Sequence, residues 1–305
     1  MLMRGPEFLG KLKRQFKITG IDEKVVELLA VALLSGGHVL LECEAELAKI
    51  LVKVLADSTG LAASIIPSEL VSELTVQISQ TSHSHQEGCR VEKSLLSPLG
   101  NIVFIYDANF YDSNSTGGTS AEFWRKLLEV LEMVEKEEVL PEHFPEPFMI
   151  MASSSLFDDM SNFQDIFMMK VQIRPAKGLE HLEGVLDSNI ESISDRETVL
   201  SLMDQAKLVW AGEAIFDYIY EITLKIRADE RVAAELSHEA SEHLLFASRA
   251  LAFLRGRNYV LPDDVKCLAE HVLSHRIVLR PEWRMKGLRA EDLVKEILDE
   301  VEVPK

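Results

Sequence analysis

The stretch from Gly36 to Ile50 constrains the chain most, because an apolar run leads through a tight turn into an apolar helix. This order of buried strand, loop and helix start is the layout that cradles phosphate. Such a loop, G-x-x-x-x-G-K-[ST], needs glycines to turn backbone N–H groups inward, a lysine for the outer phosphates, and a hydroxyl for magnesium. Of these residues the stretch keeps only the lysine, Lys49.

The remaining positions of the loop do not suit phosphate. Cys43 and Ala48 stand at the two glycine positions, and Ile50 stands at the hydroxyl position. Glu44 and Glu46 add two carboxylates, each of which would repel a polyphosphate about 6 Å away by on the order of a few kcal/mol. That repulsion exceeds the attraction of Lys49 alone. The alternative is a structural strand-to-helix turn in which Lys49 is solvated or paired with Glu44 or Glu46.

The first part of the chain alternates short apolar runs with helical periodicity, which predicts an α/β domain with a parallel sheet. Besides the run that precedes Cys43, the predicted strands are Ala62 to Ile66, Asn101 to Asp107, Phe148 to Ala152 and Met168 to Ile173. The predicted helices are Ile18 to Leu34, capped by Asp22 or Thr19, the segment from Lys49 to about Ala56, and Ala121 to Glu138.

After Arg174 only helical periodicity remains, so a small all-helical domain is expected to follow the α/β domain. We place the two domains at residues 1–176 and 177–305. The predicted helices of the second domain are Val199 to Leu208, Glu213 to Ala228, Ala240 to Leu254 and Pro262 to Leu273.

Composition predicts a soluble protein. The chain has 305 residues, no apolar run long enough to span a bilayer, and a basic N-terminus that lacks the apolar core of a signal peptide. We therefore expect it in the cytoplasm, where its three cysteines would stay reduced. A formal charge of −18 disfavours binding to nucleic acid and to anionic membranes.

Two groups of polar residues remain to be interpreted. His83, His85 and Cys89 are zinc-ligand types, but their loose spacing favours an exposed polar loop over a metal site. His38 precedes the first predicted strand and is interpreted as structural.

The segment Ala250 to Lys266, followed by Val272 to Ile277, resembles the helical lid of the MoxR family of AAA+ ATPases. The stretches Thr19 to Glu42, Leu127 to Glu129 and Pro145 to Ala152 resemble other parts of the family's ATPase domain. The resemblance implies an AAA+ module: a P-loop-type α/β domain flanked by helices, then a lid. It also implies ATP binding between the two parts, assembly into rings, and a chaperone-like role, often alongside a von Willebrand factor A domain protein.

Carried over residue by residue, the resemblance predicts that most nucleotide-site positions have changed. Asp107 keeps the place of a magnesium ligand, but Ala108 replaces the glutamate that activates water. Ser155 stands where the family has a polar asparagine. Ile166 replaces the arginine that reaches a neighbouring subunit, and Glu239 replaces the lid arginine that senses nucleotide.

The leading interpretation is a degenerate MoxR-like protein without catalytic residues, in which Lys49, Asp107 and Ser155 are vestiges of a nucleotide site. It would act as a scaffold or regulatory subunit, in a ring or beside an active MoxR paralogue, and would need no cofactor. A second interpretation is an atypical ATPase that uses Lys49 and Asp107 with ATP and magnesium, completed by Asp112 or by a partner. A third is a monomeric interaction module.

Overall fold

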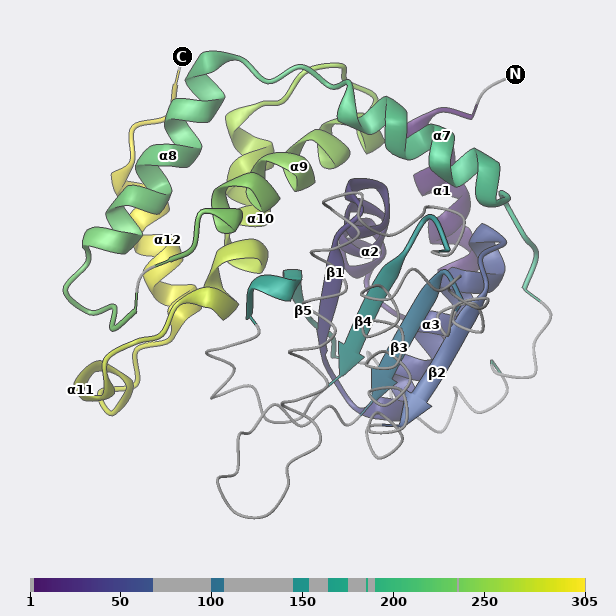
Figure 1. Ribbon diagram of the computed structural model, residues 1–305, viewed down its shortest axis with the longest axis horizontal. Helices are drawn as coiled ribbons and strands as arrows, with labels where there is room; N and C mark the ends of the chain where they lie inside the picture. The colour runs from purple at the N-terminus through teal and green to yellow at the C-terminus, as the bar shows by residue number, and fades with distance from the viewer. Residues whose placement is uncertain are drawn as a thin grey trace, which may run out of the picture.

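The computed structural model describes residues 3–67, 100–106, 145–153, 164–174, 185, 190–234 and 236–304. Its centre is a parallel sheet of five strands in the order β2-β3-β4-β1-β5 (Figure 1). The strands are β1 (His38–Glu42), β2 (Ala63–Pro67), β3 (Ile102–Tyr106), β4 (Met149–Ser153) and β5 (Phe167–Gln172). Each lies within one residue of the run that predicted it.

In the sequence the strands are continuous apolar runs, because other parts of the protein cover both faces of the sheet. All residues of β4 are buried, β1 is partly exposed only at its two end residues, and β3 only at Tyr106. The edge strand β2 is more exposed. The helix α3 (Ala45–Thr59) packs against β2, β3 and β4, and α2 (Glu23–Ser35) packs against β1 and β5.

The N-terminal helices differ from the prediction in two respects. Residues 18–34 are not one helix, because Gly20 adopts a left-handed conformation with φ of 65° and separates a 3-10 turn from α2. Asp22 caps α2, as predicted, by accepting a hydrogen bond from the backbone N–H of Lys24 at 2.8 Å. A further helix, α1 (Gly5–Phe16), was not predicted and packs on α2 and α3.

Gly36 ends α2 and turns the chain into β1. Its φ of 72° lies in the left-handed region, where a side chain is strained, and its N–H bonds the carbonyl of Leu33. The next residue, Gly37, lies so close to Met168 of β5 that a Cβ would be 2.4 Å from the sulfur. The two glycines therefore allow β1 to begin directly beside β5.

The second part of the chain is helical, which confirms the predicted fold class. It contains α7 (Arg196–Lys207), α8 (Glu213–Ala228), α9 (Glu239–Leu254), α10 (Pro262–Leu273), α11 (Pro281–Arg284) and α12 (Ala290–Glu300). Its helix α9 packs on α1 and α2, and α10 packs on β5. The apolar side chains of sheet and helices form one continuous hydrophobic cluster. Figure 1 shows these helices along the top and left of the sheet.

Some predictions fall outside the described residues: the helix from Ala121 to Glu138, the boundary between residues 176 and 177, and the polar loop with His83, His85 and Cys89. Within the described ranges no helix is long and apolar enough to cross a membrane.

Candidate functional site

The candidate site lies where β1 ends and α3 begins. Only Cys43 and Glu44 connect the two elements, and α3 starts at Ala45. The N–H of Ala48 already bonds the carbonyl of Glu44 at 3.1 Å, inside the helix. Residues 45–50, which would belong to a phosphate loop, are thus the first turns of α3. Ala48 and Ile50 are buried and contribute to the hydrophobic core.

At the carboxyl edge of the sheet, Lys49 makes two contacts with described residues. Its Nζ lies 2.7 Å from Oε1 of Glu46, one turn earlier on α3, and 3.9 Å from the centre of the Tyr106 ring. An exposed ion pair and a cation–π contact each contribute on the order of 1 kcal/mol or less. The pairing with Glu46 is one of the alternatives that the sequence left open. Because Tyr106 ends β3, Lys49 links the start of α3, which follows β1, to the carboxyl end of β3, with β4 lying between the two strands in the sheet.

The Cys43 thiol lies beside this lysine-containing turn. Burial, with smaller contributions from the charges of Glu44 and Glu42, raises its pKa to about 12. The thiol is therefore protonated at neutral pH and is a poor nucleophile or metal ligand.

Two further family positions lie where the sheet meets the helical part. Ile166, which the resemblance predicts to stand in place of an inter-subunit arginine, is buried just before β5. Its neighbour Asp165 accepts a hydrogen bond from Oγ of Ser237 at 2.6 Å. Glu239 is the first residue of α9, where a hydrogen bond to its own backbone N–H, then smaller effects of Ser237 and Arg276, lower its pKa.

Asp107, Ala108, Asp112 and Ser155 lie outside the described residues, so their proposed roles stay predictions. Among the residues that the structure describes, no three metal-ligating side chains come together.

His38 has a structural role, as interpreted from the sequence. Its Nδ1 accepts a hydrogen bond from the backbone N–H of Ile150 in β4 at 3.2 Å, and its ring meets the edge of Phe148. Burial lowers its pKa to about 4, so the ring is neutral at neutral pH.

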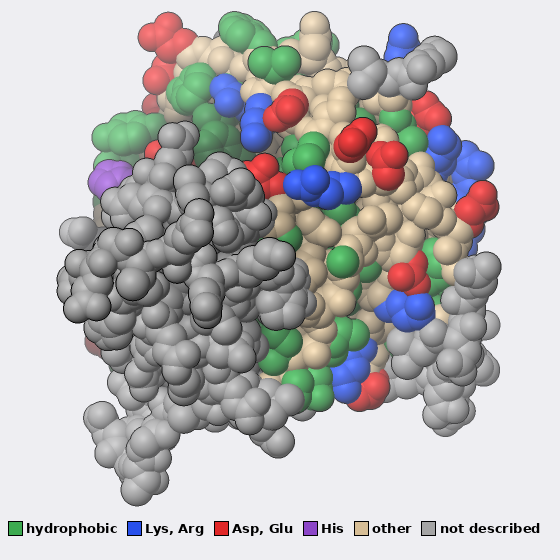
Figure 2. Space-filling view, turned by 45° about the vertical axis from the view of Figure 1, so that its right-hand side comes forward, with side chains coloured by type: hydrophobic (Ala, Val, Ile, Leu, Met, Phe, Trp, Pro, Cys, Tyr) green, Lys and Arg blue, Asp and Glu red, His purple; other side chains and the backbone are tan. Residues whose placement is uncertain are grey.

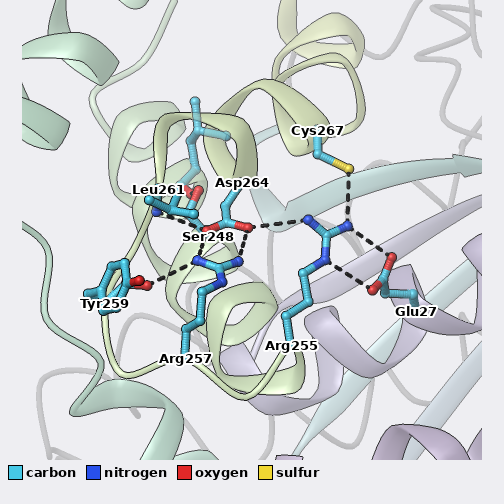
Figure 3. Close-up of polar contacts among 9 residues, drawn as sticks. Glu27, Ser248, Arg255, Arg257, Tyr259, Leu261, Asp264 and Cys267 are labelled. Atoms are coloured by element: carbon cyan, nitrogen blue, oxygen red, sulfur yellow. Dashed lines mark hydrogen bonds and ion pairs between the residues drawn. The ribbon is translucent and has the colours of Figure 1, made fainter. Parts of the chain in front are cut away.

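A buried carboxylate organises the turn between α9 and α10 (Figure 3). Asp264 is fully buried and accepts hydrogen bonds from Arg257 at 2.6 and 2.7 Å and from the backbone N–H of Leu261 at 2.9 Å. Arg255 lies 3.3 Å from the same carboxylate and from Glu27 of α2. The Arg, Gly and Asp residues that carry the resemblance to a lid therefore build its central turn.

Two other cations connect the helical part to the sheet. Arg276 donates to the carbonyl of Phe167 at 2.8 Å and lies 3.6 Å from Asp165. Burial lowers its pKa to about 10, which still leaves it charged at neutral pH. Lys170 of β5 pairs with Glu291 of α12 at 2.7 Å. The sequence analysis missed these contacts because each joins residues far apart in the chain.

Comparisons with known proteins support the fold and the helical lid. Residues 224–297 match the family model described as AAA lid domain. The chain is 28% identical over 322 residues to the uncharacterized protein YeaC of Bacillus subtilis, covering 97% of this chain and 95% of that protein. It is 26% identical to the protein named Chaperone MoxR1 of Mycobacterium tuberculosis, covering 94% of this chain and 79% of that protein.

A solved structure supports the fold over the whole chain. The crystal structure of a protein of Cytophaga hutchinsonii, assigned provisionally as an ATPase, has a TM-score of 0.76 and covers 99% of this chain and 96% of its own. At 20% sequence identity this likeness supports the fold alone.

Proposed function

We propose, from the premise that the chain is a MoxR-like AAA+ protein, that it serves as a non-catalytic, chaperone-like scaffold or regulatory subunit. The observation that carries the proposal is the contact between Lys49 and Glu46. A carboxylate 2.7 Å from the single lysine of a phosphate site neutralises the charge that would otherwise attract the phosphates.

The backbone of the same segment supports the proposal. A phosphate loop offers several N–H groups that are free of intrachain hydrogen bonds. Here the helix begins at Ala45, and the N–H of Ala48 is already bonded within it. Glu44, at the N-cap of α3, adds a second carboxylate where phosphate would approach.

The chaperone-like part of the proposal comes from the relatives. The name Chaperone MoxR1 describes a protein that this chain matches over most of both lengths. We propose protein partners for the same role: an active MoxR paralogue in a mixed ring, or a von Willebrand factor A domain protein. Neither ATP nor magnesium is needed for such a scaffold.

Calorimetric titration of the purified protein with ATP and magnesium tests the proposal. We expect no binding at millimolar nucleotide and no hydrolysis above the rate of a Lys49→Ala variant. Lys53→Ala is the matched control, because Lys53 lies one turn later on α3 and pairs with Asp57 at 2.6 Å. Hydrolysis that Lys49→Ala abolishes and Lys53→Ala preserves would overturn the proposal.

A second candidate function is an atypical ATPase, and one observation favours it. Lys49 lies over Tyr106, the last residue of β3, and Asp107 is the next residue in the sequence. In this candidate Lys49 and Asp107 hold ATP and magnesium, and Asp112 or a partner's side chain completes the site. Binding that requires both magnesium and Asp107, tested with Asp107→Asn, would favour it over the scaffold.

A further inference from the structure

A row of large apolar side chains lies exposed along α8. Phe216, Tyr220 and Leu224 recur every four residues, which places them on one face of the helix, and their exposed fractions are 45%, 57% and 45%. Trp210, 67% exposed, precedes the helix. We call these four residues the aromatic stripe. Three aromatic rings at such exposures present on the order of a few hundred Å² of apolar surface, as much as a monomer ordinarily leaves open.

The backbone holds Trp210 at the head of the stripe. Its N–H and carbonyl bond the carbonyl of Asn258 at 3.0 Å and the N–H of Val260 at 2.9 Å. Its ring covers Gly212, where a Cβ would lie 2.7 Å from the indole. Gly212 stands four residues before Phe216, so the ring continues the stripe. This exposed tryptophan is therefore held in one position and is not a loose loop side chain.

Acidic side chains follow the stripe on one flank. Glu213, Asp217 and Glu221 are exposed and recur every four residues along α8. The next residue of this row, Lys225 beside Leu224, is paired with Glu300 at 3.2 Å. Figure 2 shows hydrophobic side chains along the upper and upper-left edge of the molecule, with acidic side chains beside them. Such a surface fits an occupant that combines apolar side chains with positive charge.

The same helical part carries a surface of that kind around α11. Met285 is 89% exposed, and three basic residues around it in sequence, Arg280, Arg284 and Lys286, are exposed together with one acid, Glu282. Lys286 lies 4.1 Å from the centre of the Trp283 ring, which keeps its charge near the methionine. We call Arg280, Arg284, Met285 and Lys286 the basic knob. It projects from the lower left of the molecule in Figure 1.

We propose that the aromatic stripe binds the basic knob of a second copy of this chain, in a two-fold symmetric dimer joined through the helical parts. In Figure 1 α8 and α11 lie along the same side of the molecule. Two complementary patches on one side of a protein let two copies pair so that each knob meets the other copy's stripe. This pairing does not depend on nucleotide, so it stands apart from the proposed function.

Charge favours this occupant. The chain carries a formal charge of −18, so two copies repel unless a positive surface of one faces a negative surface of the other. The basic residues Arg14 and Lys17, beside exposed Ile18, offer another positive surface on the α/β part. In Figure 1 α1 and α8 lie in opposite halves of the molecule, so that pairing would produce a head-to-tail assembly larger than a dimer.

Sedimentation velocity over a wide concentration range, without nucleotide, tests the dimer with two charge-reversed variants. One carries Asp217→Lys and Glu221→Lys in the flank of the stripe, and the other carries Arg284→Glu and Lys286→Glu in the knob. Each variant alone should dissociate at least about tenfold more readily than the wild type, given the strength of close interfacial charge pairs. An equimolar mixture of the two should recover the dimer, because in the mixed pair both contacts again join opposite charges.

Glu191→Lys with Asp204→Lys is the control for the stripe variant, since it makes the same charge change at exposed positions away from α8. It should leave the dimer intact, and circular dichroism should show all variants folded. A wild type that stays monomeric, a mixture that fails to recover the dimer, or single variants that associate normally would each overturn the proposal. Assemblies larger than a dimer would also overturn it, because they would indicate that the stripe binds the α/β part of the next copy.

Discussion

Asp264 is buried at the start of α10, where its carboxylate accepts hydrogen bonds from Arg255, Arg257 and the backbone N–H of Leu261. A buried carboxylate is stable only while its cationic partners balance its charge. In the same way, the charges of these partners are balanced only while the carboxylate is present. Lys49 and Glu46 form the opposite case, because their pair is largely exposed and contributes little to stability.

We predict that Asp264→Ala lowers the free energy of unfolding by about 2–4 kcal/mol, since it leaves two half-buried arginines without their shared partner. Urea denaturation followed by circular dichroism measures the change. Asp292→Ala, which removes only the exposed pair with Arg289, is the control and should cost less than about 1 kcal/mol. Equal effects of both substitutions would contradict the assigned role of Asp264.

His38 and His243 make stability depend on pH. Burial lowers the pKa of His38 to about 4 and, with the nearby charge of Arg276, that of His243 to about 3. The unfolded chain protonates both rings near pH 6.5, whereas the folded chain does not until a lower pH. The unfolded state therefore binds more protons below pH 6.5, and stability falls from there to about pH 4.

We expect His38→Gln to flatten this loss between about pH 6.5 and pH 5, a window that lies above the titration of most carboxylates. The measurement is the slope of unfolding free energy against pH, from urea denaturation at several pH values. The exposed His238 provides the control substitution His238→Gln. An unchanged slope in His38→Gln would show that this ring does not contribute.

At the scale of elements, the apolar runs predicted the strands well because every strand except the edge strand β2 is buried on both faces. Asp22 also marked the start of α2 correctly. The helix α1 was not predicted, although its buried apolar residues recur at helical spacing between its lysines and arginines. The helix predicted to start at Ile18 starts later, at Glu23, because the left-handed Gly20 separates a 3-10 turn from α2.

The turn between α2 and β1 gives a prediction at this scale. Gly36→Ala should destabilise the protein by about 1–2 kcal/mol, because alanine is strained at a φ of 72°. Gly10→Ala is the control: Gly10 lies within α1, and an added Cβ would meet nothing within 4 Å. That substitution should be neutral or slightly stabilising. Thermal unfolding of both variants measures the difference.

At the scale of the whole molecule, the order of an α/β part followed by helices was predictable because it depends on local periodicity. The connections between the two parts were not, because they pair residues far apart in the chain, such as Arg255 with Glu27 and Lys170 with Glu291. For the candidate site, the sequence identified Lys49 and the acids around it. It left open whether Lys49 was solvated or paired, and its position over Tyr106 depends on the sheet order.

The continuous hydrophobic cluster has a mechanical consequence. A lid that opens around a nucleotide needs a hinge, with few apolar contacts crossing it. Here α9 packs on α1 and α2, α10 packs on β5, and the core runs through both parts without a break. Bending the chain at this junction would expose that core to water. We therefore expect the helical part to keep a fixed position against the sheet, which is the geometry that the proposed scaffold role requires.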